Sequence, residues 1–246
     1  MNKISIIILV LALIWIASFG FGKMLETSYN LENKIAILPL KGAIAPEDSS
    51  AFFFSESTVS SGDFIKKLDN IEKDKSIKAV VLDINSPGGT VVASKEIANK
   101  VKSLKKPSVA LIRDVGASGA YWVASSSDYI IADELSITGS IGVTGSYLEF
   151  SKLFEKYGIG YERLVAGDYQ DVGSPYKKLS KNEKELLQKK LDIIYSMFVE
   201  DVAANRNMSA ENLSKFANGI YYLGVEAYDI GLVDKLGSEK DAINKA

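Results

Sequence analysis

Residues 79–89 read AVVLDINSPGG and residues 108–120 read SVALIRDVGASGA, and these two stretches decide the fold. Each is a short apolar run followed at once by a turn of small residues. Ala79–Ile84 and Ser108–Ile112 are almost continuously apolar, as strands buried in a parallel sheet are. The segment between them, Thr90–Leu104, has helical spacing, so the region predicts a βαβ unit.

The same alternation continues on both sides of this unit. A polar linker over 23–33 leads into a first strand, KIAILPLKGAIA, over Lys34–Ala45. A serine-rich loop with three phenylalanines at 52–54 follows it. Ser180-x-x-Glu183 is a capping box that opens the longest helix, whose one-sided apolar stripe predicts a helix facing the core or another subunit. Further helices are predicted over 63–75, 121–126 and 151–157, a strand over 128–132, and a strand or turn over 138–143. The pattern predicts one α/β domain over 34–246.

The N-terminus does not fit that domain. Ile4–Gly22 is a run of nineteen residues without a charge, close to the ~20 residues that span a bilayer. Lys3 precedes it and Lys23 follows it, a weak bias toward a cytoplasmic N-terminus at 1–3. We expect a retained transmembrane signal anchor over 4–22, with the catalytic domain extracytoplasmic at the cell membrane. A cleaved signal peptide and a buried core helix remain as alternatives.

Composition excludes several kinds of chemistry. The chain has 29 basic and 31 acidic residues, a net charge of −2, and so lacks the basic footprint of a nucleic-acid-binding protein. It contains no cysteine, which removes disulfides and zinc–cysteine sites. It contains no histidine either, which excludes Ser-His-Asp and Cys-His mechanisms within one chain. No metal and no cofactor are expected.

Ser118 nevertheless lies in the setting of a nucleophile. It follows an apolar strand and is flanked by Gly116, Ala117, Gly119 and Ala120. Small residues permit a tight strand-to-helix turn that exposes the hydroxyl and aims backbone N–H groups outward, where they can hold an oxyanion. The turn at 85–89 is a second of this kind. Without histidine, the usual base for such a serine is a lysine.

Six motifs follow one another along the chain: Asn85-Ser86-Pro87-Gly88-Gly89, Gly116-Ala117-Ser118-Gly119, Thr138-Gly139-Ser140-Ile141-Gly142-Val143, Ala166-Gly167-Asp168-Tyr169, Gly173-Ser174-Pro175 and the segment 231–237. Taken together and in this order, they resemble the signal peptide peptidase A (protease IV) family in its short, single-domain form. The resemblance implies a Clp-protease/crotonase-like βαβ superhelix.

The resemblance also implies a site. Ser118 matches the nucleophile, the N–H groups of Gly89 and Gly119 match the oxyanion hole, and Ser140 matches a serine that orients the base. A peptide substrate is implied to bind as an extended strand beside Gly88. The position of the family's base lysine is occupied here by Gln170.

Gln170 is the departure from the family pattern. A lysine base needs a lowered pKa to accept the serine proton, whereas a glutamine amide does not titrate at all. Three explanations of Gln170 remain open: an engineered or variant residue, a natural pseudo-protease that binds peptides, or a shift in the alignment with the family. We expect none of the other candidate bases to replace it: Lys177, Lys178, Lys95, Lys152, Asp168 and Asp171.

Three functions follow as hypotheses. The first is a membrane-anchored serine endopeptidase with a Ser-Lys type site. It would degrade signal peptides and other unfolded hydrophobic peptides through an acyl ester on Ser118, and this chain would be impaired by Gln170. The second is an inactive pseudo-protease or peptide-binding scaffold. The third is an acyl-CoA enzyme on a similar fold. The family resemblance also implies a homo-oligomer.

Overall fold

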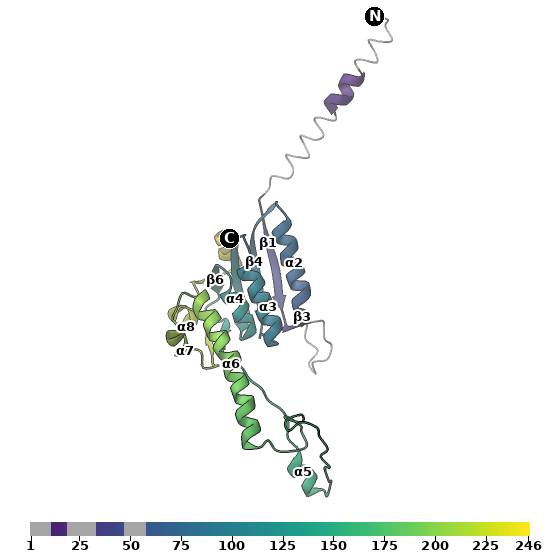
Figure 1. The fold of residues 1–246 in the computed structure, drawn as a ribbon. Helices are drawn as coiled ribbons and strands as arrows, with labels where there is room; N and C mark the ends of the chain where they lie inside the picture. The colour runs from purple at the N-terminus through teal and green to yellow at the C-terminus, as the bar shows by residue number, and fades with distance from the viewer. Residues whose placement is uncertain (1–10, 19–32, 47–57) are drawn as a thin grey trace, which may run out of the picture.

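A mostly parallel sheet organises the protein, and the computed structural model describes it through residues 11–18, 33–46 and 58–246 (Figure 1). Its strands lie in the order β1-β4-β5-β6-β9, and each neighbouring pair is parallel. A short strand, β7, pairs with the end of β5 and carries the antiparallel strand β8. The bounds are β1 Lys34–Lys41, β4 Ile77–Ser86, β5 Ser108–Ala117, β6 Tyr129–Ala132, β7 Ile137–Gly139, β8 Tyr221–Leu223 and β9 Lys235–Leu236.

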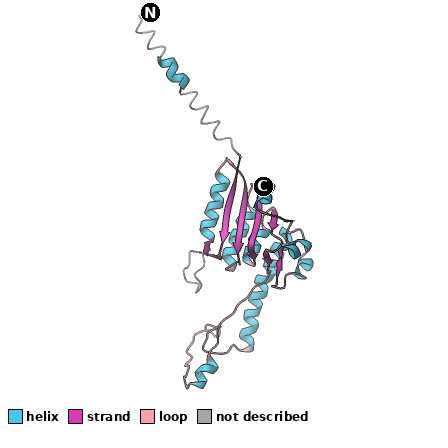
Figure 2. Ribbon diagram, turned by 180° about the vertical axis from the view of Figure 1, so that it is seen from behind, coloured by secondary structure: helices cyan, strands magenta, loops and turns pink. Residues whose placement is uncertain are grey.

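Helices cover the two faces of the sheet unequally. Alternate residues of β4 separate into two clusters: Val80, Leu82 and Ile84 belong to the main core, whereas Val81 belongs to a small cluster that includes Ala242 of α9. The main core packs against the helices drawn beside the sheet in Figures 1 and 2. The helices are α2 Ser61–Lys73, α3 Val91–Lys102, α4 Gly119–Ser125, α5 Ser151–Lys156, α6 Lys181–Asn205, α7 Ala210–Ser214, α8 Gly224–Asp229 and α9 Glu239–Lys245.

The predicted α/β fold with a buried parallel sheet is therefore confirmed, but the first strand is not one strand. The chain breaks after β1 at Gly42, whose φ is 88°, and resumes as β2, Ala43–Ala45. β2 pairs with β3, Thr58–Ser60, in a separate two-stranded sheet. The prediction of a single strand over 34–45 is wrong because it missed the left-handed turn that a glycine permits.

Helix α6 holds part of the chain away from the sheet. Its 25 residues span about 37 Å, and Ser180 caps it through the predicted capping box. In its C-terminal half, Phe198, Val199, Val202 and Ala203 are buried against the core. Its N-terminal half carries α5 and the segment up to 180 at its far end, which we call the arm (Figure 1). The predicted core-facing stripe thus contacts the core of this chain over half its length only.

The predicted membrane span lies mostly outside the described residues. Residues 11–18 form a helix, and several of its large apolar side chains are more than half exposed. Across residues 11–18, 33–46 and 58–246, no helix combines the length and apolarity needed to cross a bilayer. The phenylalanines at 52–54 also lie outside the described residues.

A largely buried ion pair ties the start of β9 to the helices. The Arg206 guanidinium donates to both carboxylate oxygens of Asp234, at 2.7 and 2.9 Å, and to the carbonyl of Gly231. Asp234 in turn accepts the N–H of Ile130 at the start of β6. Only 8% of the arginine side chain is exposed.

Replacing that arginine should therefore be costly. We expect Arg206→Met to lower the free energy of unfolding by about 3 kcal/mol, because it leaves a half-buried carboxylate without its partner. Lys181→Met, which removes an exposed ion pair to Glu185 on α6, is the control and should cost less than about 1 kcal/mol. Urea denaturation measures both values, and equal costs would contradict a structural role for the buried pair.

Candidate active site

Three turns meet where the central strands end. Ser86 at the end of β4 lies beside Gly116 of β5, and Ala117 at the end of β5 lies beside Gly139 of β7. The carboxyl ends of parallel strands form one edge of a sheet, which is where α/β proteins commonly bind their ligands. The turns after β4, β5 and β7 carry the residues predicted for the site, apart from Gln170.

Ser118 has an uncommon backbone conformation. Its φ is 52° and its ψ is −124°, outside the regions that residues with a side chain normally occupy. Its N–H donates to the carbonyl of Gly139 at 2.8 Å, and its own carbonyl accepts the N–H of Trp122 at 3.0 Å. Such strain costs about 1–3 kcal/mol and persists where the surroundings enforce it. A sharp strand-to-helix turn of this kind exposes the hydroxyl of a nucleophilic serine.

Glycines let the first two turns approach backbone to backbone. A Cβ on Gly88, whose φ is 99°, would lie 2.7 Å from the nitrogen of Gly119. A Cβ on Gly89 would lie 1.9 Å from the carbonyl oxygen of Ile44 in β2. A Cβ on Gly119 would lie 2.2 Å from the Ser94 hydroxyl and 3.3 Å from the nitrogen of Gly89. No other residue fits at these three positions without displacing a neighbour.

This close packing leaves two backbone donors beside Ser118. The carbonyl of Gly88 accepts the N–H of Ile44, and the N–H of Thr90 donates to the carbonyl of Ile44. Because backbone groups alternate in direction along an extended segment, the N–H of Gly89 points away from Ile44. The N–H of Gly119 is the first of α4 and has no acceptor within its own helix. Among the described residues, neither N–H makes a hydrogen bond. Two such donors next to a serine hydroxyl can stabilise the oxyanion of a tetrahedral intermediate.

Ser140 lies in the third turn and shares a hollow with Ser118. Its φ is 50°, its N–H donates to the carbonyl of Ile220, and its hydroxyl donates to the carbonyl of Gly219 at 3.1 Å. The hollow has a volume of about 390 Å³. Tyr195 lines it too, but its hydroxyl already donates to the carbonyl of Ala217. Its described lining contains no lysine, carboxylate or other group that titrates as a base near neutral pH.

A second, apolar pocket that Ser118 also lines was not predicted. Its volume is about 110 Å³, and its walls include Val91, Trp122 and Phe198. The rings of Trp122 and Phe198 stack with their centroids 4.3 Å apart. The walls also include Ser94, whose buried hydroxyl has no partner among the described residues. The one sequence signal was Trp122, which lies one turn into α4, the helix that begins directly after Ser118. Phe198 gave no signal, since it comes from distant α6.

Gln170 lies elsewhere. It is exposed on the arm, where its N–H donates to the carbonyl of Gly167, and it lines neither hollow. The arm packs on Glu183 near the start of α6, fifteen residues before Phe198 meets the core, an axial separation of about 22 Å. Within one chain, the structure brings together Ser118, Ser140, Gly88, Gly89 and Gly119 and leaves Gln170 apart.

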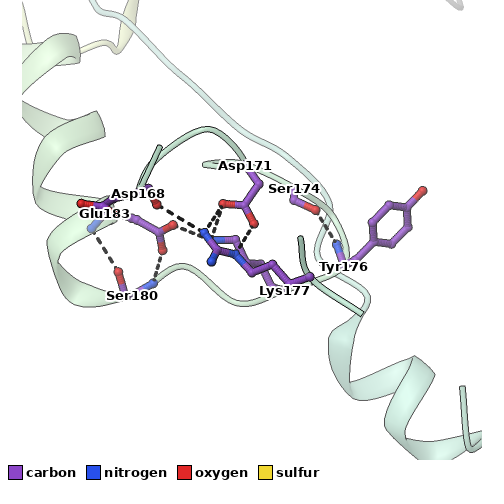
Figure 3. Close-up of polar contacts among 8 residues, drawn as sticks. Asp168, Asp171, Ser174, Tyr176, Lys177, Ser180 and Glu183 are labelled. Carbon is purple, nitrogen blue, oxygen red and sulfur yellow. Dashed lines mark hydrogen bonds and ion pairs between the residues drawn. The ribbon is translucent and has the colours of Figure 1, made fainter. Parts of the chain in front are cut away.

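Lys177 of the arm is held in an ion-pair network (Figure 3). Lys177 bonds both Asp171 and Glu183, and Arg163 forms a bidentate pair with Asp171. The bond to Glu183 raises the pKa of Lys177, and the bond from Lys177 lowers the pKa of Glu183 to about 2. A base needs the opposite shift.

The other candidate lysines are also poorly placed to act as the base for Ser118. The ammonium of Lys95 lies 3.4 Å from Asp201 and 5.5 Å from the centre of the Trp122 ring, and Lys95 does not line either hollow. Lys152 and Lys178 are exposed, on α5 and on the arm.

Comparison with known proteins gives consistent similarities. The profile of peptidase family S49 matches residues 100–246, and that of Clp proteases matches residues 50–130. The chain is 40% identical over its whole length to a provisionally named protease of Methanocaldococcus jannaschii, of which it covers 82%. It is 37% identical, over 86% of its length, to a provisionally named signal peptide peptidase of Enterococcus faecium. It is 35% identical, over 89% of its length, to protease 4 of Haemophilus influenzae.

The chain is shorter than the last two relatives, covering 62% and 35% of their lengths. Among solved structures, a ClpP1 variant from Listeria monocytogenes superposes with a TM-score of 0.56. That match covers 84% of this chain and 94% of the other, at 15% identity, and so shows a ClpP-like fold.

The contact between Gly119 and Ser94 can be tested by a double-mutant cycle. Gly119→Ala should destabilise the protein by about 1–3 kcal/mol, because the new methyl meets the Ser94 hydroxyl. The cost of Gly119→Ala should be smaller by at least about 0.5 kcal/mol when it is measured in a chain that already carries Ser94→Gly. Gly89→Ala should have a similar cost, but Ser94→Gly should not reduce it, because the methyl group at position 89 meets the backbone of Ile44. Additive effects of Gly119→Ala and Ser94→Gly in urea unfolding would contradict this packing.

Proposed function

The chain belongs to peptidase family S49, whose members are serine proteases, and from that premise we propose that it is a membrane-anchored endopeptidase of signal peptides and other unfolded hydrophobic peptides. The observation that carries the proposal is the strained Ser118 turn with the N–H groups of Gly89 and Gly119 beside it, neither of which has an acceptor in the described part of the chain. The acyl-CoA alternative has no comparable support, because the family is one of peptidases.

The chemistry assigned to this site is acyl transfer. The Ser118 hydroxyl oxygen attacks the carbonyl carbon of a peptide bond, and the N–H groups of Gly89 and Gly119 hold the resulting oxyanion. Collapse of the intermediate expels the amine with a proton and leaves an ester on Ser118, which water then hydrolyses. The apolar pocket beside Trp122 is suited to an apolar substrate side chain, and the Gly88 turn to the peptide backbone.

The missing component is the base. Position 170 carries the base lysine in the family pattern, and a glutamine there cannot accept the proton of Ser118. Because the arm lies well away from Ser118 of the same chain, we infer that position 170 reaches the site of a second copy. The exposed apolar side chains of the arm, among them Leu148, Leu164 and Tyr169, support such a homo-oligomer.

The membrane part of the proposal rests on the apolar run over 4–22. Its length suits a single span, and its flanking lysines favour a cytoplasmic N-terminus with the catalytic domain extracytoplasmic. The large exposed apolar side chains of helix 11–18 support burial of this segment in lipid.

A peptide-binding protein without peptidase activity is the second candidate, and Gln170 favours it. Such a protein would keep the turn at Gly88 and the apolar pocket but lack turnover. The two candidates differ in what a restored base does.

We expect Gln170→Lys to raise peptidase activity on a fluorogenic hydrophobic peptide by about 10²- to 10⁴-fold over the unmodified chain, the usual value of a general base. Ser118→Ala in the same background should abolish the gain. Gln170→Met is the matched control and should stay at the unmodified level. An unmodified chain that already turns over fast, through Ser118, would overturn the assignment of position 170. An inactive Gln170→Lys variant that still binds the peptide would favour the binding protein.

A further inference from the structure

Lysines gather at the pole of the domain opposite the candidate active site. All strands of a parallel sheet begin at one edge, so the segments that precede β1, β4 and β5 lie together there. Figure 1 shows β1 beginning at this edge and the C-terminus lying beside it. We call this surface the lysine pole; it consists of Lys34, Lys73, Lys75, Lys78, Lys102, Lys105, Lys106 and Lys245.

The charge of the lysine pole is poorly compensated. Among the described residues, three side-chain carboxylates lie among its eight lysines, which leaves a formal excess of five positive charges, or four when the C-terminal carboxylate next to Lys245 is counted, on a chain whose net charge is −2. Those carboxylates are engaged locally: Asp74 accepts from Ser76, Asp128 from Ser108, and Glu72 from the backbone N–H of residue 105. No lysine of the pole forms an ion pair with a described residue.

Two hollows open among these lysines. One, of about 520 Å³, is lined by Lys34, Lys75 and Lys78 together with one carboxylate, that of Asp74. The other, of about 380 Å³, has Lys105, Lys106 and Lys245 in its lining, again with one carboxylate, that of Asp128. Each volume exceeds that of ten water molecules at ~30 Å³ apiece, which leaves room for a hydrated phosphate group. The ammonium of Lys106 is held in place by the carbonyls of Ile71 and Asp74 at the end of α2.

We propose that the lysine pole docks on the anionic phosphate headgroups of the membrane in which the chain is anchored. The inference rests on the proposed anchor: only eleven residues, 23–33, separate the apolar run from β1, so the pole stays within about 40 Å of the bilayer surface even if they are fully extended. Lysines near an anionic bilayer are attracted to it additively. Docking would hold the candidate active site on the side of the domain that faces away from the bilayer.

The absence of cysteine allows a direct test. A single fluorophore is placed on Ser103→Cys at the lysine pole, or on Asn182→Cys in α6 as the distant control. The full chain is reconstituted in nanodiscs of phosphatidylcholine alone or with about 30% phosphatidylglycerol, enough for a negative surface potential. Quenching by lipids with a nitroxide on the headgroup reports contact with the surface.

We expect the Ser103→Cys probe to be quenched on anionic discs only, and released in ~1 M salt, where the Debye length is about 3 Å. Each lysine removed should lower the docked-to-undocked ratio about five-fold. Replacing Lys73, Lys75, Lys102 and Lys105 by Gln should therefore lower it by more than about 100-fold. Replacing four exposed lysines far from the pole, Lys152, Lys184, Lys189 and Lys190, by Gln should leave it unchanged.

Equal quenching on neutral discs, or quenching that survives the four pole substitutions, would overturn the proposal. So would protection of the probe that depends on protein concentration and not on lipid charge, which would indicate a second copy on this surface. The readout does not involve peptidase activity, so an inactive chain leaves it intact. If the chain fails to enter discs, that result refutes the anchor and not the docking. Docking is then tested by co-flotation of the chain with anionic vesicles, and a lack of co-flotation would overturn it as well.

Discussion

The close contact between the turns after β4 and β5 is the constraint on which the site depends. Gly88 lies against Gly119 backbone to backbone, and Gly89 is pressed against Ile44 from the other side. A Cβ at Gly88 would meet the backbone of Gly119, so it would force the turns apart and separate the N–H groups of Gly89 and Gly119. A Cβ at Gly89 would meet the carbonyl of Ile44, and one at Gly119 would meet the hydroxyl of Ser94. A preorganised pair of donors needs no rearrangement during the reaction, which is why such rigidity is useful there.

The fold separates the parts that we propose for a Ser-Lys site. The turn at Ser118 is fixed by the sheet, whereas position 170 is fixed by the arm, and helix α6 keeps the two apart. The ion pairs among Arg163, Asp171, Lys177 and Glu183 hold the arm in shape without contact to the core. In the homo-oligomer that we propose, the arm of one copy reaches the hollow that holds Ser118 and Ser140 of another copy and brings position 170 to it.

Local patterns in the sequence were sufficient to predict most of the sheet, the helices beside it and the tight turn at Ser118. Strands β4 and β5 are short apolar runs that end in small residues, and the capping box at Ser180 is a purely local signal. The break at Gly42 was missed because a glycine within an alternating apolar and polar pattern gives no sign in the sequence of whether its φ is positive. The apolar pocket was missed because Phe198 reaches Trp122 from α6, far along the chain. The position of the arm could not be predicted, since it depends on where α6 leaves the core.

The central claim is that position 170 of one copy completes the site of another, and it can be tested with two kinds of chain. One carries Ser118→Ala with Gln170→Lys, and the other is unmodified; each alone lacks either the nucleophile or the base. Co-expressed with different affinity tags and purified through both, the mixed assembly should cleave a fluorogenic hydrophobic peptide, whereas each chain alone should not. An inactive mixed assembly, alongside an active chain that carries Gln170→Lys with Ser118 intact, would show that the base acts within one chain and would contradict the account.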